Sequence, residues 1–219
     1  REEEKIEKNI INLLKEKNIP LYANSEVEGC DGKNSIEKIS VRDKIKNIVK
    51  IKAKMLCVSG GINPDVNLFT QSKGLIKWDK NYLTFKPENS FQSTITLGSA
   101  SGNFNYKKTA EEVNKKLSFL KVKEVEIKLE TNMPDDLNIK ELWETKHEKK
   151  SLWSKSFIDL QNDVTTSDLK QAVIEGFDRI EHLKRFTTNS MGTDQGKISS
   201  INSLAIVSKM LKKEISEVG

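Results

Sequence analysis

Paired glycines follow the apolar run of residues 55–58, in the order Ser-Gly-Gly-Ile-Asn-Pro. Because glycine has no Cβ atom, the backbone N–H groups at Gly60 and Gly61 can approach a ligand closely, with the Asn63 amide beside them. The same spacing is equally typical of an ordinary turn between a strand and a helix. The segment is therefore a candidate part of a nucleotide cleft, and the alternative of a plain turn stays open.

A second glycine-containing segment, residues 98–102, reads Gly-Ser-Ala-Ser-Gly and stands before a predicted helix. A strand that ends in glycine just before a helix N-terminus is a place where a dinucleotide phosphate can sit, so Gly98 and Ser99 are further candidates. An ordinary turn is the favoured alternative here. The chain contains no full Gly-x-Gly-x-x-Gly fingerprint. If a dinucleotide binds, its principal phosphate loop is therefore expected outside this chain.

Other catalytic and metal-binding patterns are weak. The chain has two histidines, His147 and His182, and two cysteines, too few for a histidine-based or four-thiolate metal site. The run Gly-Thr-Asp-Gln-Gly-Lys at 192–197 differs from an NTPase phosphate loop, because three residues separate its glycines and Ile198 replaces the magnesium-binding Ser or Thr. A Gly-x-Ser-x-Gly motif is also absent from the sequence. These observations argue against an NTPase phosphate loop, a serine hydrolase and a histidine-based metal site.

The composition is that of a polar globular protein, with 36% hydrophobic and 32% charged residues in 219. The net charge of +5 comes almost wholly from lysines that alternate with glutamates, which favours a solvated surface over a nucleic-acid-binding one. The sequence has no apolar run long enough for a membrane span and shows no secretory signal. Two unpaired cysteines indicate a reducing compartment, so we expect a cytoplasmic protein.

The elements that position these groups are predicted to form an α/β nucleotide-binding domain. Apolar residues recur at helical spacing over residues 6–14, and alternating patterns over 35–58 predict strands. We expect the apolar residues 55–58 to form a buried strand. Further extended runs and a helix are predicted at residues 74–87, 93–104 and 106–120.

The second half of the chain has a different pattern. Residues 120–155 are charged and weakly periodic, so we interpret them as a linker, and a compact unit begins at Ser156. Its helices are predicted at residues 166–177, 179–186 and 199–213. The expected domains are a partial dinucleotide-binding domain over 1–119, the linker over 120–155 and a small α-rich domain over 156–219.

Two stretches carry a resemblance to a known family. The first is MLCVSGGINPDVNLFTQSKGLIKWD at 55–79; the second covers 157–206, where EHLKRFTT is followed by MGTDQGK. Both closely resemble the α subunit of heterotetrameric sarcosine oxidase, and the similarity covers nearly the whole chain apart from the linker. The final KEISEVG resembles the segment before that family's folate-binding domain. The resemblance implies that this chain is the middle of a longer subunit.

The resemblance also implies cofactors and partners. In that family the α subunit holds NAD, and its C-terminal domain binds tetrahydrofolate. The β subunit carries FAD and oxidises the amine, a covalent FMN lies near the α–β interface, and γ and δ subunits complete the complex. The overall reaction demethylates sarcosine to glycine and forms hydrogen peroxide, with the one-carbon unit released as formaldehyde or captured on folate. We expect this chain to contribute to NAD binding and to the FMN-side interface, without catalytic residues of its own.

Related amine-dehydrogenase subunits have, at the corresponding place, a ferredoxin-like domain with Cys-x-Cys-Glu and Met-Gly-x-Cys-Gln-Gly-x-x-Cys patterns. Set on this sequence, those patterns place Asp159, Gln161, Asp194 and Ser199 at the four ligand positions. A two-iron cluster of that type requires soft thiolates, whereas these residues offer oxygen and amide groups. The resemblance therefore implies a ferredoxin-like domain that has no iron-sulfur cluster and no other metal.

The same domain contains a dense set of hydroxyl, small and cationic residues that matches the family closely. Backbone N–H groups, hydroxyls and a lysine are natural partners of a flavin phosphate. We predict that this loop faces the β subunit and helps to hold FMN. Its residues are Thr187, Thr188, Met191, Gln195, Gly196 and Lys197. Local sequence alone slightly favours a helix cap, a turn and a solvated lysine.

Two readings of the whole chain remain as alternatives. One is the α subunit of another flavin amine or opine dehydrogenase, against which the missing cysteines stand. The other is a non-catalytic scaffold whose cleft binds nothing.

Overall fold

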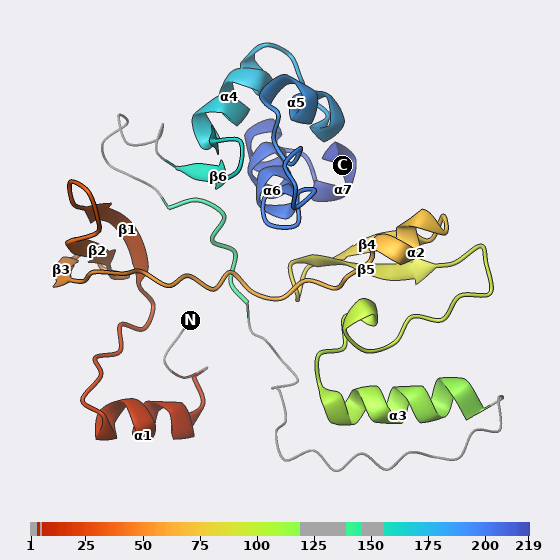
Figure 1. The fold of residues 1–219 in the computed structure, drawn as a ribbon, viewed down its shortest axis with the longest axis horizontal. Coiled ribbons are helices and arrows are strands. Elements are labelled where there is room, and N and C mark those ends of the chain that lie inside the picture. The colour runs from red at the N-terminus through yellow and green to blue at the C-terminus, as the bar shows by residue number, and fades with distance from the viewer. Residues whose placement is uncertain (1–3, 5, 119–138, 146–155) are drawn as a thin grey trace. The chain divides into compact units, whose positions relative to one another are not determined.

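A computed structural model describes residues 4, 6–118, 139–145 and 156–219 (Figure 1). The chain divides into two compact units, one made of Arg1–Ser59 with Lys140–Gly219 and the other of Gly60–Ile139. Helices alternate with short antiparallel strands in both units, so the mixed α/β character is confirmed. The domain boundaries at 119 and 155 stay a prediction, and most of the expected linker lies outside the described residues.

A three-stranded antiparallel sheet follows the first helix. Helix α1 spans Lys8–Glu16, and the strands are β1 (Glu26–Asp31), β2 (Lys38–Arg42) and β3 (Ile48–Lys52), with β2 in the middle. Alternation along β2 buries Ile39 and Val41 on one face, whereas Arg42 on the other face pairs with Glu28 of β1. The predicted strand pattern is confirmed for this segment because side chains in a strand alternate between its two faces.

The apolar run at 55–58 does not form the buried strand that its composition predicts. These residues have no regular structure, and Met55 and Val58 are 73% and 82% exposed. A strand requires a neighbour to take its backbone hydrogen bonds, and within the described residues none of the sheets includes this run. The β-rich run predicted at 93–104 is likewise replaced, by an extended segment and a short turn of 3₁₀ helix.

The described part of the unit Gly60–Ile139 is built on a hairpin and two helices. Helix α2 (Asn67–Gln71) precedes strands β4 (Leu75–Asp79) and β5 (Thr84–Asn89), and the 3₁₀ turn η2 (Gly98–Ser101) precedes helix α3 (Tyr106–Leu117). Trp78 and Phe85 pack edge to face across the hairpin, with ring centroids 5.1 Å apart. The Asp79 carboxylate accepts the N–H groups of Asn81 and Tyr82 and so closes the hairpin turn.

The C-terminal part is a small helical domain with a two-stranded hairpin at its start. Strands β6 (Phe157–Asp159) and β7 (Val164–Thr165) lead into helix α4 (Thr166–Ile174), which begins at a Thr165–Asp168 capping box. Helices α5 (Ile180–Thr187), α6 (Ser200–Leu211) and α7 (Ile215–Val218) follow. Leu169, Leu183 and Val207 are fully buried and form the core. The three longer helices confirm the helices predicted from apolar spacing.

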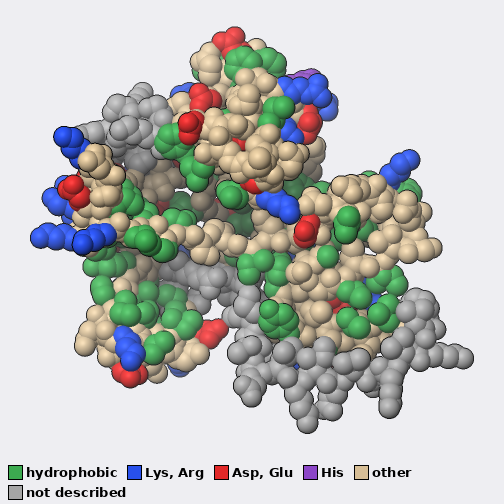
Figure 2. Space-filling view, in the orientation of Figure 1, with side chains coloured by type: hydrophobic (Ala, Val, Ile, Leu, Met, Phe, Trp, Pro, Cys, Tyr) green, Lys and Arg blue, Asp and Glu red, His purple; other side chains and the backbone are tan. Residues whose placement is uncertain are grey.

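The surface of the described residues is mixed. On the face drawn in Figure 2, lysine and arginine side chains occur over several elements and next to acidic ones. Within the described residues, none of the helices is both long and apolar enough to cross a membrane.

Candidate functional site

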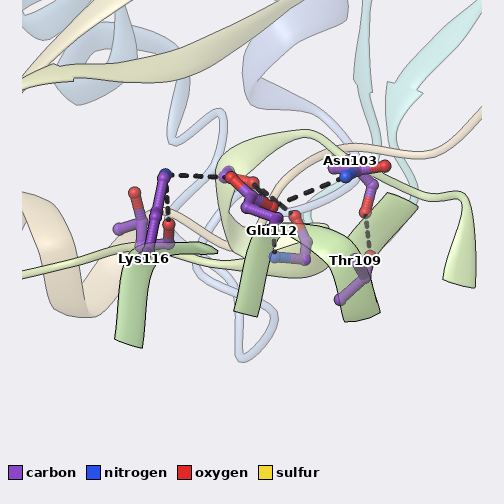
Figure 3. A network of polar contacts seen from close by, with 7 residues as sticks. Asn103, Thr109, Glu112 and Lys116 are labelled. Atoms are coloured by element: carbon purple, nitrogen blue, oxygen red, sulfur yellow. Dashed lines mark hydrogen bonds and ion pairs between the residues drawn. The ribbon is translucent and has the colours of Figure 1, made fainter. Parts of the chain in front are cut away.

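The η2 turn surrounds a carboxylate that comes from helix α3 (Figure 3). Glu112 Oε2 accepts the Gly98 N–H at 3.3 Å. The Ser101 hydroxyl, which donates to the Gly98 carbonyl at 2.8 Å, lies 3.3 Å from the same oxygen. The Asn103 amide donates to the same oxygen at 3.5 Å, and Lys116 Nζ lies 2.9 Å from Oε1. Burial raises the pKa of Glu112, but the hydrogen bonds from Lys116 and Gly98 outweigh burial and hold that pKa below 4.5. The turn therefore has an anion at its centre.

Helix α3 places this carboxylate through its N-terminal geometry. The Asn105 side chain caps the helix by accepting the Lys108 N–H at 3.1 Å, and the Thr109 hydroxyl donates to the Asn105 carbonyl at 2.9 Å. With the first turn fixed, Glu112 lies two turns along the helix, one turn before Lys116. The Lys116 ammonium also donates to the Thr96 carbonyl at 3.2 Å, which fixes the segment leading into η2.

A lysine of strand β5 lies against the other side of the turn. Lys86 Nζ pairs with Asp79 Oδ2 at 2.9 Å and lies 3.5 Å from the centroid of the Tyr82 ring. Its side chain crosses Gly102, where an added Cβ would be 2.6 Å from Lys86 Cε. Gly102 has φ +83°, so both the close approach and the left-handed backbone require glycine at this position. Glu112 and Lys86 thus hold the η2 turn from two sides.

A cavity of about 690 Å³ lies beside this turn, within the unit Gly60–Ile139. Its wall includes Ser101, Asn103 and Glu112 from the turn and α3, and Phe69 and Phe104 supply aromatic surface. Lysines at 86, 108 and 116 also line it. The volume falls in the range of small-molecule sites, and the combination of aromatic, hydroxyl and charged groups is what such sites use to orient a ligand.

The glycine pair at 60–61 lies in the same unit but in a segment without regular structure. A Cβ added at Gly60 would meet nothing within 4 Å, whereas one at Gly61 would lie 3.7 Å from Ile139 Cδ1. Gly61 has φ +120°. Within the described residues, no hydrogen bond joins Gly60, Gly61 or Asn63 to the η2 turn.

A second polar site joins the β6–β7 turn to the loop between α5 and α6, residues 188–199. Asp159 Oδ2 accepts the Ser190 N–H at 2.8 Å, and Gln161 Oε1 accepts the Thr193 N–H at 2.6 Å. The Asn162 amide donates to the Thr188 carbonyl at 3.0 Å. Three side chains of the hairpin therefore hold the loop to it.

Buried hydroxyls hold the same loop to helix α6. The Ser190 and Ser199 hydroxyls lie 2.8 Å apart, and both residues are almost fully buried. The Ser203 hydroxyl donates to the Ser199 carbonyl at 2.8 Å and also lies 3.1 Å from the side chain carbonyl of Asn189. Buried polar groups are tolerated only when each has a hydrogen-bond partner, and here the buried hydroxyls and the Asn189 amide are partners of one another.

The loop also contains unusual backbone. Thr188, Ser190 and Gln195 have positive φ angles of 62°, 63° and 51°, and Gly196 has φ +75°. Left-handed conformations of residues other than glycine persist only where the surroundings enforce them, and they concentrate at functional segments. The hydrogen bonds to Asp159, Gln161 and Ser199 supply that enforcement.

Comparison with known proteins finds a family model that matches this helical domain. Residues 153–219 match the family model described as the sarcosine oxidase A3 domain. This segment is therefore similar to the A3 domain of that family, and it is called the A3 domain below. The A3 domain is the segment in which the sequence resemblance was most specific, and that resemblance is confirmed.

Curated relatives extend the similarity beyond the A3 domain. The chain is 26% identical over 201 residues to the sarcosine oxidase subunit alpha of Corynebacterium sp. strain U-96, which covers 87% of this chain and 21% of that protein. The corresponding protein of Rhizobium meliloti strain 1021 is 43% identical over 74 residues, covering 31% of this chain and 8% of that protein. The chain thus spans about a fifth or less of the length of these relatives.

A solved structure shares the fold. The crystal structure of L-proline dehydrogenase from P. horikoshii aligns with a TM-score of 0.63 and 21% identity, covering 96% of this chain and 44% of that chain. At this identity the likeness concerns the fold alone.

The A3 domain brings all six predicted flavin-contacting residues into or next to the α5–α6 loop. Thr187 ends α5, and its hydroxyl donates to the Leu183 carbonyl at 2.9 Å. Met191 is 52% exposed. The Gln195 amide donates to the Gly192 carbonyl at 3.0 Å, and the N–H groups of Gly196 and Lys197 donate to Asp194. The backbone donors expected to face a phosphate are therefore engaged inside the loop.

The A3 domain also brings together the four positions that correspond to cysteine ligands in related subunits. Asp159, Gln161 and Ser199 bond the loop as described, and Asp194 Oδ2 accepts the Ile198 N–H at 3.2 Å. Within the described residues, no group of three or more His, Cys, Asp or Glu side chains is arranged to hold a metal ion.

Sequence reasoning missed Glu112 and Lys86. Glu112 stands four residues before Lys116 on an amphipathic helix, a spacing that indicates only a solvated pair. Lys86 precedes a proline near the end of β5, where nothing in the local sequence indicates its contact with Gly102.

Proposed function

We propose that this chain is part of the α subunit of a flavin-dependent sarcosine oxidase. The observation that carries the proposal is the match of residues 153–219 to the sarcosine oxidase A3 domain. Similarity to a named α subunit over 87% of the chain supports it. The complete enzyme would demethylate sarcosine to glycine in the cytoplasm, forming hydrogen peroxide and either formaldehyde or methylene-tetrahydrofolate. The β, γ and δ subunits would be its partners, with FAD and tetrahydrofolate bound elsewhere in the complex.

In this proposal, the unit Gly60–Ile139 contributes to an NAD site. The residues involved would be Gly60, Gly61, Asn63, Gly98 and Ser99. Open space beside Gly60 supports the proposal, because backbone approach to a ligand requires it. The cavity beside η2 supports it by its size and its mixture of aromatic and hydroxyl groups. NAD would serve as a bound dinucleotide, and this chain would supply contacts rather than reacting groups.

The A3 domain would contribute to the FMN-side subunit interface through its α5–α6 loop. Because the N–H groups of Gly196 and Lys197 already donate to Asp194, the contact would be made by side chains. The side chains suited to an FMN contact are the hydroxyl of Thr188, the exposed thioether of Met191 and the cation of Lys197. The hydrogen bonds that fix the left-handed loop support the proposal, since a cofactor contact requires a pre-organised frame.

The experiment uses the full-length protein that carries this chain, produced with its partner subunits. Sarcosine-dependent hydrogen peroxide formation and mass spectrometry of the released nucleotides are measured together. We expect peroxide, NAD and both flavins. An absence of flavin and of amine oxidation would favour the scaffold alternative. Oxidation of a different amine, with no turnover of sarcosine, would favour another flavin amine dehydrogenase.

Gly60→Val tests the cleft itself. The added Cβ meets nothing within 4 Å of protein, so the fold should be retained while NAD content falls. Gly29→Val is the matched control, because an added Cβ there also meets nothing within 4 Å but lies in strand β1. Gly61→Val is less informative, since φ +120° adds about 1–3 kcal/mol of backbone strain whether or not NAD binds. Full NAD occupancy in Gly60→Val would remove this segment from the site.

A further inference from the structure

The donors of the η2 turn converge on a single oxygen atom. The Gly98 N–H and the Asn103 amide donate to Glu112 Oε2 at 3.3 and 3.5 Å (Figure 3). The Ser101 hydroxyl lies 3.3 Å from the same oxygen and also donates to the Gly98 carbonyl at 2.8 Å. A concave set of N–H and O–H donors is the arrangement by which protein turns bind anions. Here the bound anion is a carboxylate of the same chain.

These bonds are long, whereas the opposite oxygen is held firmly. Charge-assisted hydrogen bonds are usually 2.7–2.9 Å long, so contacts of 3.3–3.5 Å are long and weak for a carboxylate. The 2.9 Å contact between Oε1 and Lys116 has the ordinary length. The Glu112 carboxylate is therefore held mainly by its ion pair with Lys116, and its hydrogen bonds to the turn are weak.

The neighbouring cavity has the charge to receive a different anion. Lysines 86, 108 and 116 line it, against Glu88 and Glu112. With Glu112 present, the field at the turn is close to balanced. Without its charge, Lys86 would still pair with Asp79, but Lys108 and Lys116 would face Glu88 alone, and the donors of the turn would have no anion.

We propose that Glu112 is an internal anion that occupies the anion-binding donors of the η2 turn, and that a phosphate-bearing ligand enters the turn only by displacing it. This inference rests on the proposed function, because Gly98 and Ser99 belong to the proposed NAD site. Glu112 acts as a gate on that site: it keeps the turn folded without ligand and competes with the ligand's phosphate. It is a positioning residue and takes no part in chemistry.

The test is calorimetric titration of the full-length protein with inorganic pyrophosphate. Glu112→Gln keeps the size of the side chain and removes its charge. We expect its pyrophosphate affinity to rise about fivefold, which corresponds to the loss of one like-charge contact of about 1 kcal/mol in water. Glu111→Gln makes the same change of charge on the exposed neighbour and is expected to leave the affinity within about twofold of the wild type.

A merely structural role for Glu112 predicts the opposite result. In that case Glu112→Gln and Glu112→Ala lower the melting temperature and leave pyrophosphate binding unchanged or weaker, which would overturn the proposal. An equal gain in Glu111→Gln, or no pyrophosphate binding by any variant, would also overturn it. NAD content of the wild-type protein is measured separately: NAD present with no effect of Glu112→Gln rejects the gate alone, whereas NAD absent rejects the proposed NAD site.

Discussion

The carboxylate of Asp159 accepts the backbone N–H of Ser190 at 2.8 Å, although the two residues are 31 positions apart. Both residues are 3% exposed, so the bond lies away from water, where an unpaired polar group is costly. The other carboxylate oxygen accepts the N–H groups of Gln161 and Asn162. One side chain thus shapes the β6–β7 turn and also fastens the α5–α6 loop to it.

Replacing this carboxylate by an amide should destabilise the A3 domain. Asp159→Asn keeps the size of the side chain but turns an NH₂ group toward a backbone N–H, so one donor is left unpaired. We expect a loss of about 1–3 kcal/mol in the free energy of unfolding, measured by urea denaturation. Asp163→Asn, at an exposed position of the same turn, should change it by less than about 0.5 kcal/mol. Equal stability of both variants would contradict the role of Asp159.

The same residue predicts a pH dependence. Burial raises the pKa of Asp159, but the N–H groups of Ser190, Asn162 and Gln161 outweigh burial and hold it below 3.8. Since the folded pKa is the lower one, the stabilisation is present above the unfolded pKa and is lost as the pH falls through the folded pKa. The stability difference between wild type and Asp159→Asn should therefore be constant above about pH 5 and shrink below pH 3.8. A difference that grows on acidification would reject this assignment.

Gly196 is predicted to be intolerant of any side chain. An added Cβ would clash with the Ser200 hydroxyl and lie 2.6 Å from Ser190 Cβ, in addition to the strain of φ +75°. We expect Gly196→Ala to lower the free energy of unfolding by at least about 2 kcal/mol. Gly176→Ala isolates the strain, because its φ is +95° and an added Cβ there meets nothing within 4 Å. If both variants lose the same stability, close packing at Gly196 is not the reason for its glycine.

We predict that the purified protein contains no iron-sulfur cluster. The four positions that correspond to cysteine ligands carry Asp159, Gln161, Asp194 and Ser199, whose polar atoms bond to the protein itself. Iron and acid-labile sulfide should both be far below one equivalent per chain when the protein is prepared anaerobically. A stoichiometric amount of both would show that another set of ligands holds a cluster.

The proposed flavin contact is tested by Lys197→Ala in the assembled complex. Loss of a cation beside the cofactor should lower FMN content or slow flavin reoxidation, and FAD content should stay unchanged. An effect of about 1 kcal/mol corresponds to roughly a fivefold change in occupancy or rate. Lys209→Ala removes an exposed lysine of helix α6 and is the control. Unchanged FMN content together with an unchanged reaction with oxygen would remove Lys197 from the interface.

The sequence predicted the parts of the fold that depend on local signals. The helices of the A3 domain follow from apolar spacing, a signal that acts within one or two turns. The prediction of a strand at 55–58 is wrong because a strand must pair with a neighbour that is distant in the sequence. The composition of the run cannot reveal whether such a neighbour exists. The predicted helix over 106–120 is present as α3, but its importance for η2 was not visible.

The candidate sites likewise combine features that the local sequence reveals with contacts between distant segments that it does not. The α5–α6 loop was recognisable because hydroxyl, glycine and lysine residues are concentrated there. The hydrogen bond between Asp159 and Ser190 could not be foreseen, since it joins segments that only the packed helices bring together. Glu112 was missed because an acidic residue one turn before a lysine is common on solvated helices.

The hydrogen bonds from the β6–β7 turn to the α5–α6 loop have a consequence for the order of folding. They join residues 26 to 32 positions apart, so each closes a chain loop that contains both α4 and α5. Closing such a loop costs entropy before any bond is gained, which favours their formation after the two helices have docked. Weakening them should then accelerate unfolding and leave the refolding rate nearly unchanged. The loop proposed to face the flavin would be the last part of the A3 domain to acquire its native structure and the first to lose it.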